Sequence, residues 1–160
     1  MKKQNSIIIV FILLGIILSV LLIYNRLEKG IKMKIENIKS LEYFYTTGYY
    51  INADVRYNIE CEKSCILKIK PQGKSNEEQE EYELSEETLK QIEDLLNKYQ
   101  VSEWDGFNKT DSRVLDGNSF HFYVTYEDGK SISASGYMSY PKNYGIVTKE
   151  LERILKEQMK

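Results

Sequence analysis

The sequence predicts an α+β fold, in which an antiparallel β-sheet of two hairpins plus an extra strand carries two amphipathic helices, preceded by an N-terminal transmembrane helix. Three observations predict it. Residues 6–24 form an uncharged apolar run. Apolar and polar residues alternate on both sides of two short loops, and two later segments have apolar residues at helical spacing. The order of these segments favours helices on one face of an antiparallel sheet.

The apolar run, Ser6 to Tyr24, would form a helix roughly 28 Å long, about the hydrocarbon thickness of a bilayer. It is longer than the apolar region of a signal peptide, and no small-residue cleavage site follows it. We therefore expect an uncleaved anchor. The predicted organisation is an N-terminal tail (1–5), a transmembrane anchor (6–24), a juxtamembrane segment (25–40) and an α+β domain (41–160).

The charges around the run bear on its orientation. Lys2 and Lys3 favour a cytoplasmic N-terminus, whereas several basic residues between Arg26 and Lys39 favour the opposite arrangement. A first apolar segment behind a short basic tail usually acts as a signal-anchor. We expect a single-pass protein of the cell membrane whose domain lies outside the cytoplasm, at the cell envelope.

Composition narrows the class of partner. The chain has 160 residues and a net charge of −2, and its acidic residues outnumber its basic ones. This balance argues against nucleic acid, which needs a basic surface to neutralise phosphates. The 13 tyrosines supply area that can be buried and argue against disorder. No cofactor is predicted, the oligomeric state is open, and the expected partners are the membrane, through residues 6–24, and a protein.

The first strand is predicted over Leu41–Asn52, with a turn or bulge at Gly48. It contains several tyrosines that either form an aromatic binding surface or pack in the core, and core packing is the commoner role of tyrosine in half-buried strands. These tyrosines are Tyr43, Tyr45, Tyr49 and Tyr50.

Val55–Lys70 is predicted to be a hairpin with a three-residue loop, which places Cys61 opposite Cys65 and keeps the apolar residues on one face. Directly opposed cysteines have a Cα separation suitable for a disulfide. Two free thiols are the alternative, and they are expected if the domain is cytoplasmic. A metal site is disfavoured, because C-x-x-x-C with one distant histidine is a poor zinc signature.

A second hairpin is predicted over Phe120–Gly136. A three-residue loop ending at Gly129 keeps the faces consistent, because it pairs Val124 with Ile132 and Phe122 with Ala134. His121 then lies on the opposite, solvated face with the alternate serines of the second strand.

Two helices are predicted. Ser85 is expected to cap a helix that ends near Tyr99, and Pro141 to occupy the first position of a helix within residues 139–160. The segments between elements, 71–82 and 101–119, are predicted to be loops, the second pinned to the core by Trp104 and Phe107. The acids of that second loop do not follow EF-hand spacing, so no metal site is predicted.

Several motifs in the second half resemble an uncharacterised bacterial family of small α+β proteins, some of them membrane-anchored. They are Trp104-Asp105-Gly106-Phe107, Val114-Leu115-Asp116-Gly117-Asn118-Ser119-Phe120, Ile132-Ser133-Ala134-Ser135-Gly136 and Pro141-Lys142-Asn143-Tyr144. The resemblance covers most of the domain after residue 41. It implies one intact domain, and it transfers no activity and no catalytic residue.

The sequence favours a membrane-anchored, non-catalytic binding domain over an enzyme, because no convergent polar set stands out. The candidate binding surface consists of Trp104, Asp105, Phe107, Asp116 and His121. Two alternatives stay open. One is an immunity-type inhibitor that binds through the acidic run Glu77–Glu81, and the other is a hydrolase that uses the 104–121 loop with His121 and Ser133.

Overall fold

The computed structural model describes residues 15–17, 19, 34–48, 54–70, 74–75 and 78–159. The chain divides into two compact units, Met1–Met33 and Lys34–Lys160. In the first unit, residues 15–17 and 19 are helical. The predicted transmembrane segment 6–24 otherwise lies outside the described residues. Within the described part of the chain, no helix has both the length and the apolar character needed to cross a membrane.

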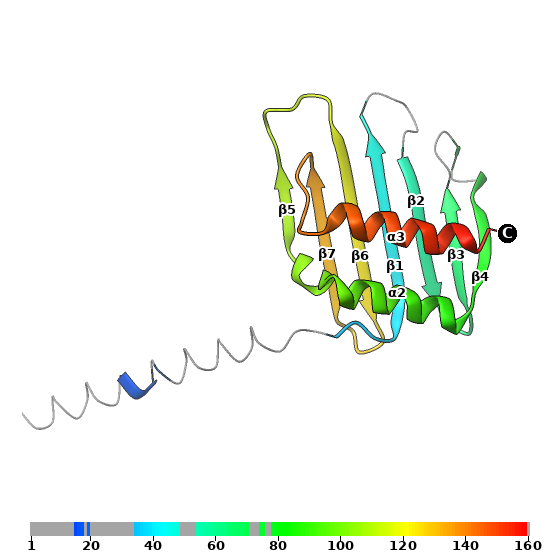
Figure 1. Ribbon diagram of the computed structural model, residues 1–160, viewed down its shortest axis with the longest axis horizontal. Coiled ribbons are helices and arrows are strands. Elements are labelled where there is room, and N and C mark those ends of the chain that lie inside the picture. Colours follow the sequence, from blue (N-terminus) through cyan, green and yellow to red (C-terminus); the bar gives the residue numbers. More distant parts are fainter. Residues whose placement is uncertain are drawn as a thin grey trace, which may run out of the picture. The chain divides into compact units, whose positions relative to one another are not determined.

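The second unit is an α+β domain built on one sheet (Figure 1). Its elements in chain order are β1 (Ile38–Thr47), β2 (Asp54–Cys61), β3 (Cys65–Lys70), β4 (Glu80–Leu84), α2 (Glu86–Lys98), the 3-10 helix η2 (Val101–Trp104), β5 (Phe107–Thr110), β6 (Asn118–Tyr126), β7 (Ser131–Tyr137) and α3 (Tyr144–Glu157). The seven strands lie in the order β4-β3-β2-β1-β6-β7-β5. Neighbours are antiparallel except β5 and β7, which are parallel. The predicted fold class is confirmed for this domain.

Both hairpin registers are confirmed. Cys61 lies opposite Cys65 in the β2–β3 hairpin, and the structure joins the two by a disulfide. In the β6–β7 hairpin Val124 pairs with Ile132, and Gly129 adopts a φ of 81° in the turn. This left-handed conformation suits glycine and ends the short loop at the predicted position.

Two strands were not predicted, because both are edge strands. β4 carries three glutamates among its five residues, and β5 is four residues long with only Phe107 partly buried. An edge strand has a solvated side, so it does not need the apolar alternation by which strands are recognised, and charge on it discourages pairing with other chains. The predicted loops over residues 71–82 and 101–119 were therefore wrong at β4 and β5.

The first strand begins earlier than predicted. β1 starts at Ile38 rather than at Leu41, and the preceding Ile35 is 1% exposed. The side chain of Asn97 on α2 holds Ile35 from both sides, because its Oδ1 accepts from the Ile35 N–H at 2.8 Å and its Nδ2 donates to the Ile35 carbonyl at 2.7 Å. The segment before β1 thus packs into the domain.

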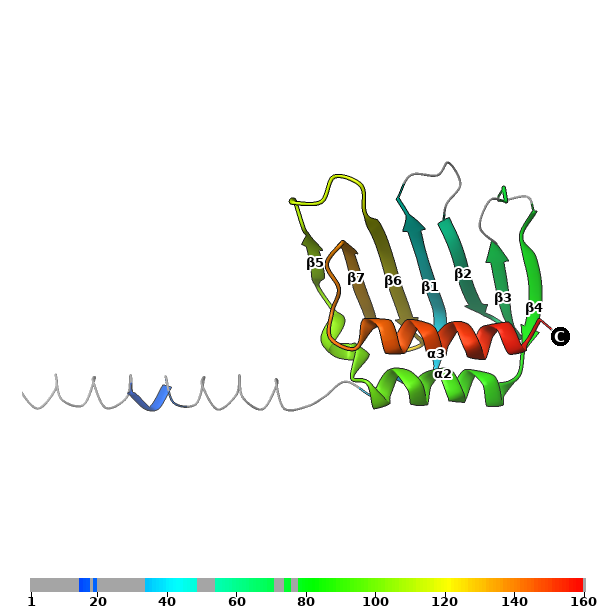
Figure 2. The same cartoon turned by 45° about the horizontal axis from the view of Figure 1, so that its top comes forward.

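The helices α2 and α3 lie side by side on one face of the sheet and cross its strands (Figures 1 and 2). Ser85 caps α2 as predicted, with its hydroxyl accepting from the Thr88 N–H at 3.1 Å. α3 begins at Tyr144, not at Pro141, because Asn143 adopts a left-handed φ of 64° and separates the Pro141 turn from the helix. Both helices bury their predicted apolar stripes on the sheet.

Candidate functional site

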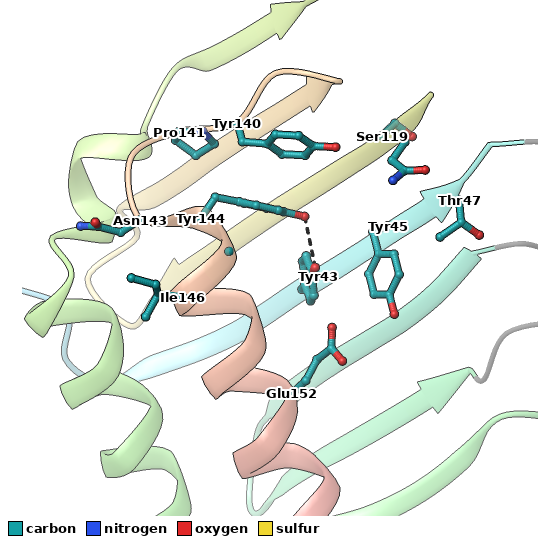
Figure 3. Close-up of a pocket in the computed structure, with 12 residues that line it drawn as sticks. Tyr43, Tyr45, Thr47, Ser119, Tyr140, Pro141, Asn143, Tyr144, Ile146 and Glu152 are labelled. Carbon is teal, nitrogen blue, oxygen red and sulfur yellow. Dashed lines mark hydrogen bonds between the residues drawn. The ribbon is translucent and has the colours of Figure 1, made fainter. Parts of the chain in front are cut away.

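An open groove lies where the sheet extends beyond α3, on the face that the helices cover (Figure 3). Its volume is about 660 Å³, within the usual range for small-molecule sites. Strands β1 and β6 form one side, and α3 with the turn before it forms the other. Its lining residues are Tyr43, Tyr45, Thr47, Asn118, Ser119, Tyr140, Pro141, Asn143, Tyr144, Gly145, Ile146 and Glu152. We call it the tyrosine groove.

Strand β1 supplies Tyr43 and Tyr45, which point to the same face because side chains two residues apart in a strand do so. Tyr43 is 2% exposed, and its ring is stacked at 6.1 Å on that of Tyr57. Its hydroxyl lies 3.2 Å from the hydroxyl of Tyr144. Tyr45, one pleat further along, is partly exposed, with its ring 5.7 Å from that of Tyr43. Tyr43 therefore forms the floor of the groove, and Tyr45 is its accessible ring.

The turn between β7 and α3 supplies the opposite side. Tyr140 stacks on Tyr144 with ring centroids 4.8 Å apart, and Phe120 of β6 lies 4.5 Å from the Tyr144 ring. The turn needs a glycine at position 136, because a Cβ there would lie 2.1 Å from the Ser139 carbonyl oxygen. Gly136 thus allows the chain to fold back closely over β7 and to place Tyr140 beside the helix.

Glu152 of α3 is the charged residue of the groove. Figure 3 shows its carboxylate on the side of the helix that faces Tyr43 and Tyr45. Its side chain is 20% exposed, and it pairs with the more exposed Lys156 one helical turn later at 2.9 Å. Among the described residues that line the groove, no other is an acid, and none is Lys, Arg or His.

Three tyrosines of the groove, Tyr43, Tyr45 and Tyr144, are held in their neutral form. Burial raises the pKa of Tyr43 and Tyr45, and burial raises that of Tyr144 to about 12. The negative charge of Glu152 raises all three pKa values further. These hydroxyls therefore exchange hydrogen bonds but do not carry charge near neutral pH.

A second groove, of about 570 Å³, lies beside α2 and the tip of the β2–β3 hairpin. It mixes acidic and basic side chains, and two of its polar residues hold the backbone before β1. Glu93 accepts from the Ile38 N–H at 3.1 Å, and Asn97 binds Ile35 as described above. The polar groups of this groove therefore fix the entry of the chain into the sheet.

Two of the predicted surface residues pack beneath or beside the tyrosine groove. Trp104 is 2% exposed, donates its indole N–H to the Lys142 carbonyl at 3.0 Å, and lies 5.9 Å from the Tyr144 ring. The Phe107 ring lies 6.3 Å from that of Phe120. Both residues pin the 101–110 segment to the core, as the sequence predicts.

The other three predicted residues lie apart. Asp105 accepts a hydrogen bond from the Ser133 backbone N–H at 3.0 Å, Asp116 is exposed in the connection between β5 and β6, and His121 faces the side of the sheet opposite the helices. The imidazole of His121 stacks on the Phe44 ring at 5.2 Å. The structure therefore does not bring the five residues into one surface.

Two of the residues suggested for a hydrolase share one face of the sheet. His121 and Ser133 belong to the outer face, but they are not paired across the strands, because His121 lies opposite Ser135. The carboxylate of Asp105 already accepts a hydrogen bond from the backbone N–H of Ser133. Among the residues that the structure describes, no group of three His, Cys, Asp or Glu side chains is arranged to hold a metal ion.

The fold and the groove define an α+β domain with an aromatic surface site. No family model matches the chain, and the comparison with curated proteins also gives no match.

The sequence drew attention to two of the residues that line the tyrosine groove, and it favoured core packing for them. It singled out Tyr43 and Tyr45 as an alternative aromatic surface, but it did not identify Tyr140, Tyr144 or Glu152 as site residues. Tyr144 and Glu152 are eight residues apart, about two helical turns, which places them on one face of the predicted helix and was a usable signal. What the sequence does not show is that this part of α3 lies over β1.

Proposed function

We propose that this chain is a single-pass membrane protein that displays a non-catalytic binding domain at the cell envelope, and that the tyrosine groove is its binding site. The observation that carries the proposal is the groove itself. It combines an open cavity, accessible aromatic rings and one partly shielded carboxylate, which is the usual composition of a small-ligand site.

The groove favours binding over chemistry. A tyrosine whose pKa is raised stays protonated near neutral pH, so it is a poor general base or nucleophile there. Glu152 is ion-paired with Lys156 and is flanked by rings rather than by a nucleophile. Rings and hydroxyls in this arrangement suit stacking and hydrogen bonding to a ligand.

Two observations support the proposed membrane anchor and the proposed location of the domain outside the cytoplasm. Residues 6–24 are uncharged and long enough to span a bilayer as a helix. The Cys61–Cys65 disulfide supports an extracytoplasmic domain, because disulfides persist mainly in oxidising compartments.

Labelling of the two cysteines, which are the only ones in the chain, tests the location. Intact cells that express the full chain are treated with a membrane-impermeant maleimide, with and without a brief reduction. We expect the protein in the carbonate-resistant membrane fraction and labelling only after reduction. Labelling only after cell lysis, or recovery in the carbonate-extracted fraction, would contradict the proposal. A Cys61→Ser, Cys65→Ser double variant is the control for specificity.

A thermal-shift screen tests the site. The full chain in a neutral polyoxyethylene detergent is screened against a panel of ammonium compounds, saccharides and short peptides. We expect stabilising ligands to lose their effect in Tyr45→Ala, which opens the groove, and to keep it in Tyr123→Ala, on the opposite face. Ligands that bind equally to both variants would place the binding site elsewhere.

A further inference from the structure

We propose that the tyrosine groove binds an organic ammonium group, seated over the Tyr45 ring and beside the Glu152 carboxylate. This inference rests on the proposed function, because it takes the groove as the binding site and names the chemistry of what it binds. Four features of the groove support it.

The charged side chain of the groove is a carboxylate. Among the lining residues that the structure describes, Glu152 is the one acid and none is Lys, Arg or His, while burial raises the pKa of Tyr45 and Tyr144. Its side chain is 20% exposed, so its field is less screened by water than that of a surface carboxylate. This carboxylate favours a cation at this end of the groove, in competition with the ammonium group of Lys156.

The aromatic rings of the groove also favour a cationic ligand. The face of an aromatic ring carries partial negative charge and attracts a cation, more strongly where the cation is desolvated. Tyr45 offers a partly exposed ring, and the Tyr43 ring lies 5.7 Å from it. An ammonium with methyl or methylene substituents gains both this attraction and apolar contact with the rings.

The structure already places an ammonium on Glu152. The Nζ atom of Lys156 lies 2.9 Å from a Glu152 oxygen, but the Lys156 side chain is 57% exposed. An ion pair with so exposed a partner contributes little to stability, so a ligand that is better shielded from water can replace it. Lys156 thus shows that the carboxylate accepts this group and that it is held only weakly.

The position of the ammonium follows from the helix. The N-terminus of α3, at Tyr144, carries the positive end of the helix dipole, which opposes a cation there. That effect falls off within the first turn, whereas Glu152 lies about two turns further along. We place the charged group at the Glu152 end. The groove volume of about 660 Å³ leaves room for an uncharged portion of the ligand along Tyr140 and Pro141.

The test compares choline with 3,3-dimethylbutan-1-ol, its neutral carbon isostere, on the full chain in the same neutral detergent. Trp104, the single tryptophan, lies 5.9 Å from the Tyr144 ring and reports binding by fluorescence. We expect choline to bind at least tenfold more tightly than the isostere. Glu152→Gln should remove this preference, and Lys156→Met should increase it, because Lys156 competes with the ligand.

Glu157→Gln is the matched control, because Glu157 is also a helix α3 carboxylate but pairs with Arg153 and does not line the groove. It should leave the preference unchanged. Equal binding of choline and the isostere, or a preference that survives Glu152→Gln, would overturn the ammonium assignment.

The same titration distinguishes failure of the ammonium assignment from failure of the groove as the binding site. It also distinguishes the possible sources of the ammonium group. A saccharide that binds in a Tyr45-dependent manner while choline does not would overturn the ammonium assignment and leave the groove as the binding site. Choline binding that is unaffected by Tyr45→Ala would contradict the groove itself. Comparing choline, glycerophosphocholine and Nα-acetyl-lysine methylamide distinguishes a free amine, a lipid headgroup and a peptide side chain as the source.

Discussion

Buried tyrosine hydroxyls in the domain differ in what they contact. The Tyr43 hydroxyl lies within hydrogen-bond distance of Tyr144, whereas the Tyr126 hydroxyl is buried without a hydrogen-bond partner among the residues described. An unsatisfied buried polar group costs about 1–3 kcal/mol, while a satisfied one contributes about 0.5–1.5 kcal/mol. Chemically identical substitutions at the two positions should therefore have opposite effects.

We predict that Tyr126→Phe raises the free energy of unfolding by about 1 kcal/mol, because it removes the unsatisfied hydroxyl. Tyr43→Phe should lower it by a similar amount, about 1 kcal/mol, because it leaves the Tyr144 hydroxyl without this contact. Urea denaturation of both variants measures the difference. A loss of stability in Tyr126→Phe would show that its hydroxyl has a partner in solution.

The buried tyrosines also predict alkaline sensitivity. Burial raises the pKa of Tyr43, Tyr57 and Tyr126, and raises that of Tyr144 to about 12. The unfolded chain releases these protons near pH 10, so stability is complete below that pH and falls as pH rises toward the folded-state pKa values. Each such tyrosine contributes a slope of about −1.4 kcal/mol per pH unit.

Denaturation at pH 8, 10 and 11, together with the absorbance of tyrosinate, measures this effect. Tyr144→Phe should reduce the loss of stability between pH 10 and 11 by about 1 kcal/mol, because an unfolded tyrosine is only half ionised at pH 10. Ionisation of all tyrosines near pH 10 in the folded protein would contradict the burial that the structure shows.

At the scale of elements, the connection from β7 to α3 shapes the groove. A Cβ at Gly136 would lie 2.1 Å from the Ser139 carbonyl oxygen and 2.7 Å from the Phe120 ring. A Cβ at Gly145, in the first turn of α3, would meet nothing within 4 Å. The two glycines are nine residues apart in sequence, yet only one of them is required by packing.

We predict that Gly136→Ala lowers the free energy of unfolding by about 1–3 kcal/mol, the usual cost of overpacking. It should also displace Tyr140 and weaken binding in the groove. Gly145→Ala should be neutral or should stabilise by up to about 1 kcal/mol, because alanine favours the helix over glycine. Thermal or urea unfolding decides between them, and equal losses in both variants would contradict the close contact at Gly136.

The elements also show what could be predicted from sequence. Both hairpin registers followed from apolar alternation and loop length, because a slip by one residue would expose the apolar side. The edge strands β4 and β5 were missed because solvated edges do not impose that alternation. The tyrosine groove was not predicted as a site, because its two sides come from β1 and α3, about 100 residues apart, and no local pattern brings them together.

At the scale of the whole molecule, an apolar N-terminal segment precedes a domain with an aromatic groove. The domain begins at Lys34, and Asn97 holds Ile35 at its start. Acidic residues on the β4 edge, Glu80, Glu81 and Glu83, discourage strand pairing between copies. Among the surface features described, the tyrosine groove is the one whose shape and charge most clearly suit a ligand.

Photo-crosslinking in intact cells tests most directly whether the tyrosine groove is the binding site of the protein. A photoreactive amino acid replaces Ile146 at the rim of the groove or, as the control, the 92% exposed Leu115 in the connection between β5 and β6. If the groove is the binding site, we expect a discrete adduct at position 146, identified by mass spectrometry. This adduct should be absent at position 115 and should be lost when Glu152→Gln is added. The same adducts at both positions, or an adduct at position 146 that persists with Glu152→Gln and with Tyr45→Ala, would contradict this assignment of the binding site.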